Sequence, residues 1–337
     1  MINRYSRQTL FKGIGAEGQR KLGNSYVVII GCGALGTIIA TSLVRAGIGK
    51  VRIIDRDFIE YHNLQRQVLF DEDDIGNGLP KAIAAVRHLK KVNSSIEIEG
   101  VVSDVNYTNI EKLVSGADLI MDGLDNLETR FLINDASLKH KIPWVYGGAI
   151  SSFGMTMSII PGKTPCFRCL PSTTSHPEAV LTCDTAGVIS PAPFIIGALQ
   201  SAEALKILVG AEEINRDLII IDVWQGTLDH IKIVPRRDCP ACQDRYQFLE
   251  GRLGLKTTSL CGQNAVQILN SEARSLSLKE LAARLKPVVA EVRYNEFMLR
   301  FTEGEHEMVV FSDSRAILRN TTDESLARGL YTKYVGT

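Results

Sequence analysis

Apolar and amphipathic stretches alternate along the first 150 residues. Five short apolar runs predict β-strands, at residues 26–30, 51–55, 96–101, 119–121 and 144–148. Helical patterns stand before or between them, at residues 5–24, 34–46, 80–92 and 127–140. Continuous apolar strands that alternate with helices are typical of a parallel sheet with both faces covered. The pattern therefore predicts an α/β protein with a doubly wound sheet.

The pattern changes from about residue 153. Strands are predicted at 155–160 and 218–223, which add an antiparallel part to the sheet, and a long buried helix is predicted at 188–209. A first domain, 1–245, is followed by a polar linker, 246–259.

Residues 260–337 predict a small α+β unit of their own. We expect a hairpin of two strands, 298–301 and 308–311, around the polar residues 303–307. The other predicted elements are strands at 266–269 and 288–292 and helices at 278–285 and 323–331.

Composition narrows the class of protein. The 337 residues are 45% apolar and 23% charged, which are ordinary globular values and exclude a disordered chain, a coiled coil and a collagen. The 38 Lys and Arg residues balance 38 Asp and Glu residues, so the net charge is zero and a nucleic-acid partner is disfavoured. Seven cysteines are too few for a disulfide scaffold and indicate metal or thiol chemistry in a reducing cytoplasm.

Neither the start of the chain nor its apolar stretches indicate a secreted or membrane protein. Residues 1–10 lack the apolar core of a secretory signal. Residues 24–44 and 185–202 are uncharged and long enough to span a bilayer, but glycines interrupt the first and prolines the second. We expect both stretches to be buried inside a cytoplasmic protein without a membrane partner.

A glycine-rich turn with the sequence GCGALG (31–36) follows the first predicted strand and opens the next helix. Gly31, Gly33 and Gly36 let the backbone approach a phosphate, and the helix N-terminus offers free N–H groups. Asp55 ends the following strand at a distance suited to a ribose hydroxyl. These features indicate an adenine-nucleotide site in a Rossmann-like sheet, with NAD as the first candidate and a tight turn without ligand as the alternative.

Three further clusters favour ATP over a dinucleotide. Asn63 and Arg66 lie in HNLQRQ (62–67), Lys81 lies in the first turn of a helix, and Asp125 and Asn126 lie in DGLDN (122–126) after a strand. A triphosphate needs cations for its phosphate oxygens and a carboxylate for Mg²⁺, whereas a dinucleotide site does not need this set. Each residue alone is more often a solvated surface charge, but several would share the sheet edge where open α/β sheets bind ligands.

Two C-x-x-C pairs, Cys166 with Cys169 and Cys239 with Cys242, can offer four thiolates to one tetrahedral ion. We therefore expect a structural zinc site, with redox-active pairs or free thiols as the alternatives. Cys183 precedes a predicted helix, where a thiol can act as a nucleophile or can be a small buried residue. Cys32 is small enough for the glycine turn, and Cys261 has no interpretation.

Ordered motifs carry a resemblance to a known family: RYSRQ (4–8), GCGALG (31–36), DRD with NLQRQ (55–67), LPK (79–81), GLDN with TR (123–130), the C-x-x-C pairs and TCDTAG (182–187). Residues 1–245 resemble the ThiF/MoeB-type adenylyltransferases, the bacterial relatives of ubiquitin-activating enzymes. The resemblance implies an enzyme that uses MgATP to adenylate the C-terminal Gly-Gly carboxylate of a small ubiquitin-like sulfur-carrier protein, ThiS-like or MoaD-like, and releases pyrophosphate.

The resemblance also implies roles for single residues. The three glycines, Asp55 and Asn63 would bind the nucleotide, Arg66 and Lys81 would neutralise its phosphates, and Asp125 would hold Mg²⁺ with Asn126 beside it. The cysteines Cys166, Cys169, Cys239 and Cys242 match zinc ligands. Arg7 matches an arginine that reaches into the ATP site of a neighbouring protomer, which implies a homodimer. Arg130 matches an arginine near the site, and Cys183 matches a cysteine that links covalently to the carrier during sulfur transfer.

Several alternatives stay open. TCDTAG and the extension favour a ThiF-like role in thiamine biosynthesis over a MoeB-like role in molybdopterin biosynthesis, with a sulfurtransferase or cysteine desulfurase as a further partner. One alternative is a related ATP-dependent reaction, because relatives adenylate a peptide C-terminus or cyclise a tRNA base. The remaining alternatives are an NAD-dependent oxidoreductase and a non-catalytic scaffold. Residues 260–337 resemble the extension of some firmicute ThiF-like proteins, and their role is open between carrier docking, dimer support and a passive appendage.

Overall fold

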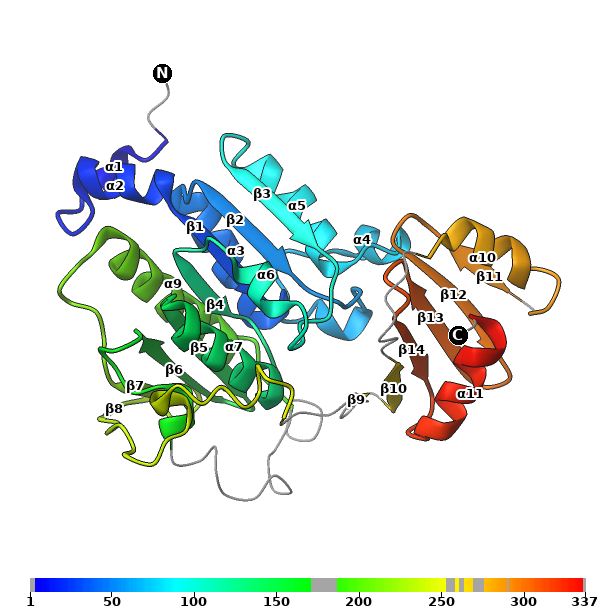
Figure 1. The fold of residues 1–337 in the computed structure, drawn as a ribbon. Helices are drawn as coiled ribbons and strands as arrows, with labels where there is room; N and C mark the ends of the chain where they lie inside the picture. The colour runs from blue at the N-terminus through cyan, green and yellow to red at the C-terminus, as the bar shows by residue number, and fades with distance from the viewer. Residues whose placement is uncertain are drawn as a thin grey trace. The chain divides into compact units, whose positions relative to one another are not determined.

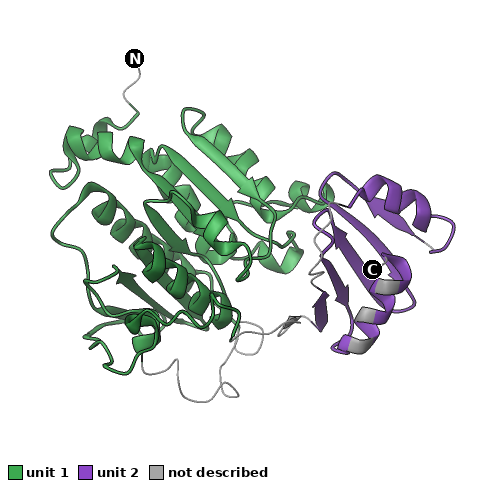
Figure 2. Ribbon diagram, in the orientation of Figure 1, with its two compact units in different colours: residues 1–253 green, residues 254–337 purple. Residues whose placement is uncertain are grey.

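The computed structural model describes residues 4–170, 187–252, 258–260, 264–268, 276–289 and 291–335. The chain forms two compact units, residues 1–253 and residues 254–337 (Figure 2). The division falls inside the segment predicted as a linker, 246–259. Residues 246–252 nevertheless belong to the first unit, because Phe248 and Leu249 pack against its core.

The first unit is built on one eight-stranded sheet with the order β3-β2-β1-β4-β5-β6-β7-β8 (Figure 1). The pairs from β3 to β5 are parallel, and the pairs from β5 to β8 are antiparallel. This confirms the predicted Rossmann-like sheet with an added antiparallel part. The strands are β1 (Tyr26–Ile30), β2 (Lys50–Ile54), β3 (Glu97–Val101), β4 (Leu119–Asp122), β5 (Trp144–Ile150), β6 (Phe153–Ile159), β7 (Leu218–Asp222) and β8 (Thr227–Ile231).

Helices cover both faces of the parallel strands because the central strands β1 and β4 are apolar on both sides. In β1, Val27 and Ile29 join a core with α3, α5 and α9, whereas Val28 and Ile30 join a second core with α6 and α7. The helices of this unit are α1 (Ser6–Thr9), α2 (Gly15–Asn24), α3 (Ala34–Ala46), α4 (Glu72–Gly76), α5 (Lys81–Val92), α6 (Ile110–Val114), α7 (Leu127–His140) and α9 (Pro191–Val209), with 3₁₀ turns η1 (Tyr61–Asn63), η2 (Phe167–Cys169) and η5 (Ala241–Gln243).

Helix α9 is long and apolar enough to cross a membrane by length and composition, with a mean hydropathy of 1.4. Half of that stretch is buried inside the protein. Its buried Gln200 donates a hydrogen bond to the carbonyl of Asp122 at 2.9 Å, and its buried Glu203 accepts one from the backbone N–H of Asn215 at 2.9 Å. These polar contacts belong to the core helix of a sheet, as the prediction of a buried helix expected.

Strand β8 is not among the predicted elements. All five of its residues are exposed, because it is the edge strand of the sheet and carries no buried face. A strand without a buried face has no alternation of apolar and polar residues, so the sequence pattern lacks its signal.

In its described residues, the second unit is an antiparallel sheet with the order β11-β12-β13-β14-β10-β9 and two helices. The predicted hairpin is confirmed, because Met298 pairs with Phe311 and Glu303 with His306. The predicted strand at 288–292 is wrong: Val288 and Val289 lie in the turn that follows α10, and β11 begins only at Val292. The elements are β9 (Thr258–Leu260), β10 (Ala265–Ile268), β11 (Val292–Tyr294), β12 (Met298–Glu303), β13 (His306–Phe311), β14 (Ala316–Arg319), α10 (Leu278–Leu285) and α11 (Glu324–Tyr334).

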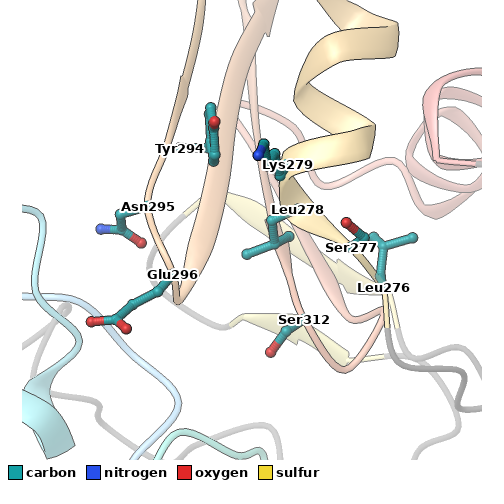
Figure 3. A pocket seen from close by; sticks show the side chains of 8 residues that line it. All are labelled: Leu276, Ser277, Leu278, Lys279, Tyr294, Asn295, Glu296 and Ser312. Carbon is teal, nitrogen blue, oxygen red and sulfur yellow. The ribbon is translucent and has the colours of Figure 1, made fainter.

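One open pocket of about 420 Å³ lies in the second unit, at the start of α10 (Figure 3). Its lining mixes apolar and charged side chains, among them Leu278, Lys279, Tyr294 and Glu296. This set contains no histidine, no cysteine and no pair of carboxylates, so it does not indicate a particular chemistry.

Candidate functional site

The glycine turn links β1 to α3 by direct backbone contact. Gly31 has a φ of +91°, which favours glycine, and a Cβ there would lie 2.5 Å from the carbonyl oxygen of Gly123. A Cβ on Gly36 would lie 2.0 Å from the carbonyl oxygen of Gly31. A Cβ on Gly33 would meet nothing closer than 3.8 Å, so the turn is open on this side. The turn therefore combines tight packing with a half-buried backbone at Gly33, at the N-terminus of a helix, which suits a phosphate.

Asp55 follows β2 and is bound to this turn. Its carboxylate accepts hydrogen bonds from the backbone N–H of Cys32 at 2.6 Å and from that of Asp57 at 2.7 Å. Burial raises the pKa of Asp55, and the ammonium of Lys81 opposes that effect. Because each carboxylate oxygen has a second lone pair, the side chain keeps acceptors for a ribose hydroxyl.

Lys81 is the first residue of α5, and its side chain is only 9% exposed. Its Nζ lies 3.6 Å from a carboxylate oxygen of Asp57. Burial opposes the charged form, but the carboxylates of Asp57, Asp55 and Asp125 outweigh it, so the pKa of Lys81 is raised. The charges of Asp55 and Asp125, which belong to two other motifs, therefore act on the ammonium of Lys81.

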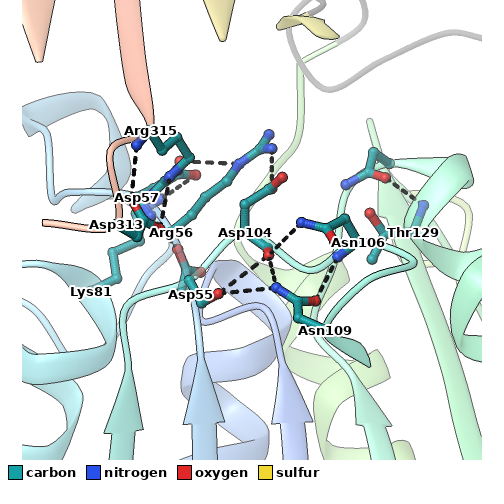
Figure 4. A network of polar contacts seen from close by, with 12 residues as sticks. Asp55, Arg56, Asp57, Lys81, Asp104, Asn106, Asn109, Thr129, Asp313 and Arg315 are labelled. Carbon is teal, nitrogen blue, oxygen red and sulfur yellow. Dashed lines mark hydrogen bonds and ion pairs between the residues drawn. The ribbon is translucent and has the colours of Figure 1, made fainter. Parts of the chain in front are cut away.

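Arg56 is a further residue of this edge that the sequence analysis did not select. Its Nη1 donates to a carboxylate oxygen of Asp104 at 2.6 Å, and Asn109 donates to the carbonyl of Asp104 at 2.7 Å (Figure 4). The carboxylates of Asp104 and Asp57 raise the pKa of Arg56 against the effect of burial. The only sequence signal for Arg56 was its position beside Asp55 in the DRD tripeptide. Its partner Asp104 could not be inferred from the sequence, because Asp104 lies in a loop 48 residues away.

The HNLQRQ segment contributes one residue that was predicted to bind phosphate and one that was not. Arg66 donates to the carbonyl of His62 at 2.8 Å. Gln67 is 4% exposed, its Oε1 has no hydrogen-bond partner among the described residues, and its Nε2 lies 3.9 Å from the Cβ position of Gly33. An orphaned buried amide beside an open glycine backbone fits a polar ligand at this place.

Two predicted nucleotide ligands also cap helical turns. Asn63 accepts a hydrogen bond from the backbone N–H of Glu60 at 3.0 Å. Asn126 is the N-cap of α7 and accepts from the backbone N–H of Thr129 at 2.9 Å. In this structure both side chains orient the backbone around Arg66 and Asp125, and Asp125 itself is exposed.

Arg7 lies apart from these residues in its own chain. It is exposed on α1, whose Gln8 bonds to the carbonyl of Ala46 at the C-terminal end of α3. The glycine turn is at the other end of α3, and 13 residues of helix separate the ends by about 20 Å. An arginine of α1 therefore does not reach the glycine turn of the same chain.

The four paired cysteines form one cluster. The Sγ atom of Cys166 lies 3.8 Å from that of Cys169, 3.6 Å from that of Cys239 and 3.4 Å from that of Cys242. Zinc–sulfur bonds of about 2.3 Å in a tetrahedron place the sulfurs about 3.8 Å apart, so this donor set fits zinc. The backbone N–H of Arg236 also donates to Cys169 at 3.4 Å, as expected around a thiolate.

Asp71, Asp74 and His88 form a second cluster, with ligand atoms within 4.8 Å of one another. Asp71 and Asp74 accept hydrogen bonds from each other's backbone N–H groups at the start of α4, and His88 lies 2.8 Å from Asp74. These hydrogen bonds account for the cluster as a contact between α4 and α5.

Cys183 and Cys261 lie outside the described residues. The predicted nucleophile therefore stays a prediction from its motif.

Comparisons with known proteins agree with this site. Residues 5–242 match the model of the ThiF family, so the chain belongs to that family. Over the full length of both proteins it is 42% identical to a protein of Bacillus subtilis named sulfur carrier protein ThiS adenylyltransferase. It is 34% identical to the SAMP-activating enzyme E1 of Haloferax volcanii, over 72% of this chain and 88% of that protein.

A similar solved structure is MccB of E. coli with AMPCPP and MccA, at 29% identity and a TM-score of 0.63. The match covers 72% of this chain and 74% of that one. The predicted membership of the ThiF/MoeB-type proteins is confirmed by the family match and by the full-length similarity.

We expect one zinc ion per chain, because four sulfurs at tetrahedral spacing bind zinc tightly. Cys239→Ser should lose most of the zinc and lower the melting temperature, whereas Cys261→Ser, outside the C-x-x-C pairs, should keep both. Elemental analysis by mass spectrometry and a thermal melt measure the two effects. Full zinc content in Cys239→Ser would show that the four sulfurs do not share one ion.

Asp135 is a buried carboxylate in α7 that holds the end of the first unit. One oxygen accepts from the backbone N–H of Phe248 at 2.9 Å and of Leu249 at 3.5 Å. The other oxygen has no hydrogen-bond partner among the described residues. Burial raises the pKa of Asp135 to about 6, although these N–H groups oppose the shift.

The raised pKa predicts how stability changes with pH. Between about pH 4 and 6 the folded protein keeps a proton on Asp135 that the unfolded chain releases. The stabilisation that comes from this proton is therefore lost as pH rises. Asp135→Asn should therefore be more stable than the wild type at pH 8, by on the order of 3 kcal/mol, and equal to it near pH 4. Urea unfolding at both pH values measures this difference.

A matched change, Asp229→Asn on the exposed strand β8, should leave the free energy of unfolding within about 0.5 kcal/mol at both pH values. An Asp135→Asn protein less stable than the wild type at pH 8 would contradict the assignment of the raised pKa.

Proposed function

We propose that this chain is an ATP-dependent adenylyltransferase that activates the C-terminal Gly-Gly carboxylate of a ubiquitin-like sulfur-carrier protein and releases pyrophosphate. The observation that carries the proposal is the full-length similarity to a ThiS adenylyltransferase, in a chain whose Asp55 binds the glycine turn and whose Lys81 pairs with Asp57. The names of the relatives support the same activity, as the sequence analysis expected.

The chemistry needs placed cations and no general base. The carrier carboxylate is ionised at neutral pH and attacks the α-phosphorus of ATP, and pyrophosphate leaves. The open backbone at Gly33 and the N-terminus of α3 bind phosphate oxygens, and Lys81 and Arg66 neutralise the charge that develops. Asp125 and neighbouring carboxylates suit Mg²⁺, which supplies further charge neutralisation when bound. Asp55 holds the ribose and so fixes the position of the α-phosphate.

The zinc in this proposal is structural. Four thiolates leave no coordination position for a substrate, so the ion joins residues 166–169 to residues 239–242 and takes no part in the transfer. The four cysteines of the cluster and Cys32 are free thiols, which persist in a reducing compartment. We therefore place the enzyme in the cytoplasm.

The proposal includes a homodimer. Because about 20 Å of α3 separates α1 from the glycine turn, Arg7 can serve an ATP site only in a second chain. Such an arginine would complete the cationic side of the site from the partner, in line with the role that the family resemblance implies for Arg7.

The pathway follows from the carrier. The similarity to a protein named for ThiS favours sulfur transfer in thiamine biosynthesis, with a MoaD-like carrier for molybdopterin as the alternative. In this pathway a sulfurtransferase or cysteine desulfurase supplies the sulfur, and Cys183 forms the covalent link to the carrier.

A second candidate is adenylation of a short peptide at its C-terminus. It is favoured by the family resemblance, which includes relatives that adenylate a peptide, and by the similarity to MccB, whose solved structure contains MccA. Pyrophosphate exchange into ATP with purified Gly-Gly carriers tests the first proposal. Exchange that depends on one carrier and is lost without its last glycine supports it, and exchange only with a peptide supports the second.

Arg66→Ala and Asp125→Ala should each lower carrier-dependent pyrophosphate exchange about 100-fold or more, because each removes charge neutralisation at the reacting phosphates. Circular dichroism and zinc content should stay unchanged. Arg20→Ala, which removes an exposed arginine paired with Glu17, should exchange like the wild type. Near-normal turnover in either site variant would contradict the assignment.

Arg7→Ala and Asp125→Ala should complement each other if Arg7 acts in the partner's site. Each variant alone is expected to be inactive. After unfolding and refolding together, half of the dimers are mixed and each has one intact site, so activity should return to about a quarter of the wild-type value. A mixture that stays inactive would contradict an arginine supplied by the partner.

Cys183→Ser should keep pyrophosphate exchange and lose formation of the carrier thiocarboxylate, because adenylation requires no thiol and the covalent link requires one. Mass spectrometry of the carrier measures the second step, with Cys261→Ser as the control. Undiminished thiocarboxylate in Cys183→Ser would remove the role of this cysteine.

A further inference from the structure

Arg130 is a buried cation directly beneath the segment that presents Asp125. It lies in the first half of α7, and its side chain is 9% exposed. Its Nε donates to a carboxylate oxygen of Asp122 at 3.0 Å. Its Nη2 donates to the carbonyl oxygens of Leu124 and, at 2.9 Å, of Gly147. One guanidinium therefore joins the end of β4, the segment after it and β5.

Asp122 fixes the same segment from the other side. It is completely buried, and its carboxylate accepts from the backbone N–H of Leu124 at 2.9 Å. Gln200 of α9 donates to the carbonyls of Asp122 at 2.9 Å and of Val145 at 3.2 Å. Leu124 is thus held through both its N–H group and its carbonyl group.

The next residue along the chain is Asp125, which is exposed. The backbone from which it projects has few free torsions, because Leu124 is bound on one side and the N-cap Asn126 on the other. From this geometry we infer that Arg130 is a positioning residue, which sets the orientation of Asp125 toward Mg²⁺. The inference rests on the proposed function in taking Asp125 as the Mg²⁺ ligand.

The arrangement requires an arginine. The planar guanidinium makes bonds to a carboxylate and to two carbonyls at fixed angles, and it lies 5.3 Å from the centre of the Tyr146 ring. A lysine keeps the positive charge beside Asp122 but has one nitrogen, so it cannot hold all three acceptors in this geometry. Arg130→Lys therefore distinguishes the effect of the positive charge from the effect of the hydrogen bonds to Leu124 and Gly147.

The test is the affinity for ATP, measured by titration calorimetry on the full chain without a carrier, in Mg²⁺ and in EDTA. Arg130→Lys should weaken Mg²⁺-dependent ATP binding about 10- to 100-fold, the usual effect of losing an outer-shell partner of a metal ligand. ATP binding in EDTA should not change. Arg52→Lys is the matched control, because Arg52 also joins a carboxylate, Glu99, to a carbonyl, that of Leu113, and none of these three residues is assigned to the site.

A double-mutant cycle gives the decisive readout. In an Asp125→Asn background, Arg130→Lys should cause no further loss of Mg²⁺-dependent affinity, because the arginine acts through Asp125. Additive losses would overturn the inference, and so would equal losses in Mg²⁺ and EDTA, which would indicate direct contact with the nucleotide. Wild-type affinity for MgATP in a folded Arg130→Lys protein would also overturn it.

If Arg130→Lys does not fold, Asp122→Asn keeps an acceptor for Leu124 and is expected to give the same Mg²⁺-dependent loss. A wild-type chain whose ATP binding ignores Mg²⁺ would contradict both the proposed function and this inference. A chain that binds MgATP but adenylates no carrier would contradict the proposed function alone.

Discussion

The contact among three glycine backbones is the constraint on which the site depends. The carbonyl oxygen of Gly31 would lie 2.0 Å from a Cβ on Gly36 and 2.2 Å from a Cβ on Gly123. Because no other residue lacks a Cβ, β1, α3 and the segment after β4 approach one another only with glycine at these positions. This contact places the N-terminus of α3, the carboxylate of Asp55 and the segment that carries Asp125 at one edge of the sheet, where open α/β sheets bind their ligands.

The buried cations at this edge of the sheet are neutralised by neighbouring carboxylates rather than by solvent. Lys81 lies among the carboxylates of Asp55, Asp57 and Asp125, and Arg56 is bound by Asp104. The carboxylates around Lys81 outnumber its single ammonium group. This excess of negative charge suits a nucleotide with a bound divalent cation better than a nucleotide without one. The raised pKa of Lys81 keeps its ammonium charged in spite of burial, so its positive charge is available to a phosphate.

Helix α7 connects this edge to the cysteine cluster. Asn126 caps its start beside Asp125, and Asn134 in its middle accepts a hydrogen bond from the backbone N–H of Phe167, between the first two cysteines. Leu138 packs against the cluster itself. A zinc ion in the cysteines would thus anchor the far end of the helix whose first residues form the Mg²⁺ side of the proposed site. This is a physical reason for a metal site that takes no part in the proposed reaction.

The sequence by itself determined the order of elements, because strands with two buried faces and amphipathic helices carry strong periodic signals. The predicted elements match β1, α3 and α7 residue for residue, at 26–30, 34–46 and 127–140. It also determined the chemical inventory, since the glycine turn, Lys81, Asp125 and the cysteine pairs stand in recognisable motifs. It missed β8, which has no buried face, and it also missed the short elements β9, β14, α4 and α6. It misplaced the strand at 288–292, where Val288 is exposed and Val289 packs in a turn. The caps at Asn63 and Asn126 are local contacts, each to a residue three positions away, and only the structure showed them. Only the tertiary structure decided that Arg56 is bound by Asp104 and that Arg130 and Asp122 form a buried pair. These two contacts join separate elements, and their geometry depends on how the strands and helices pack, which no local pattern encodes.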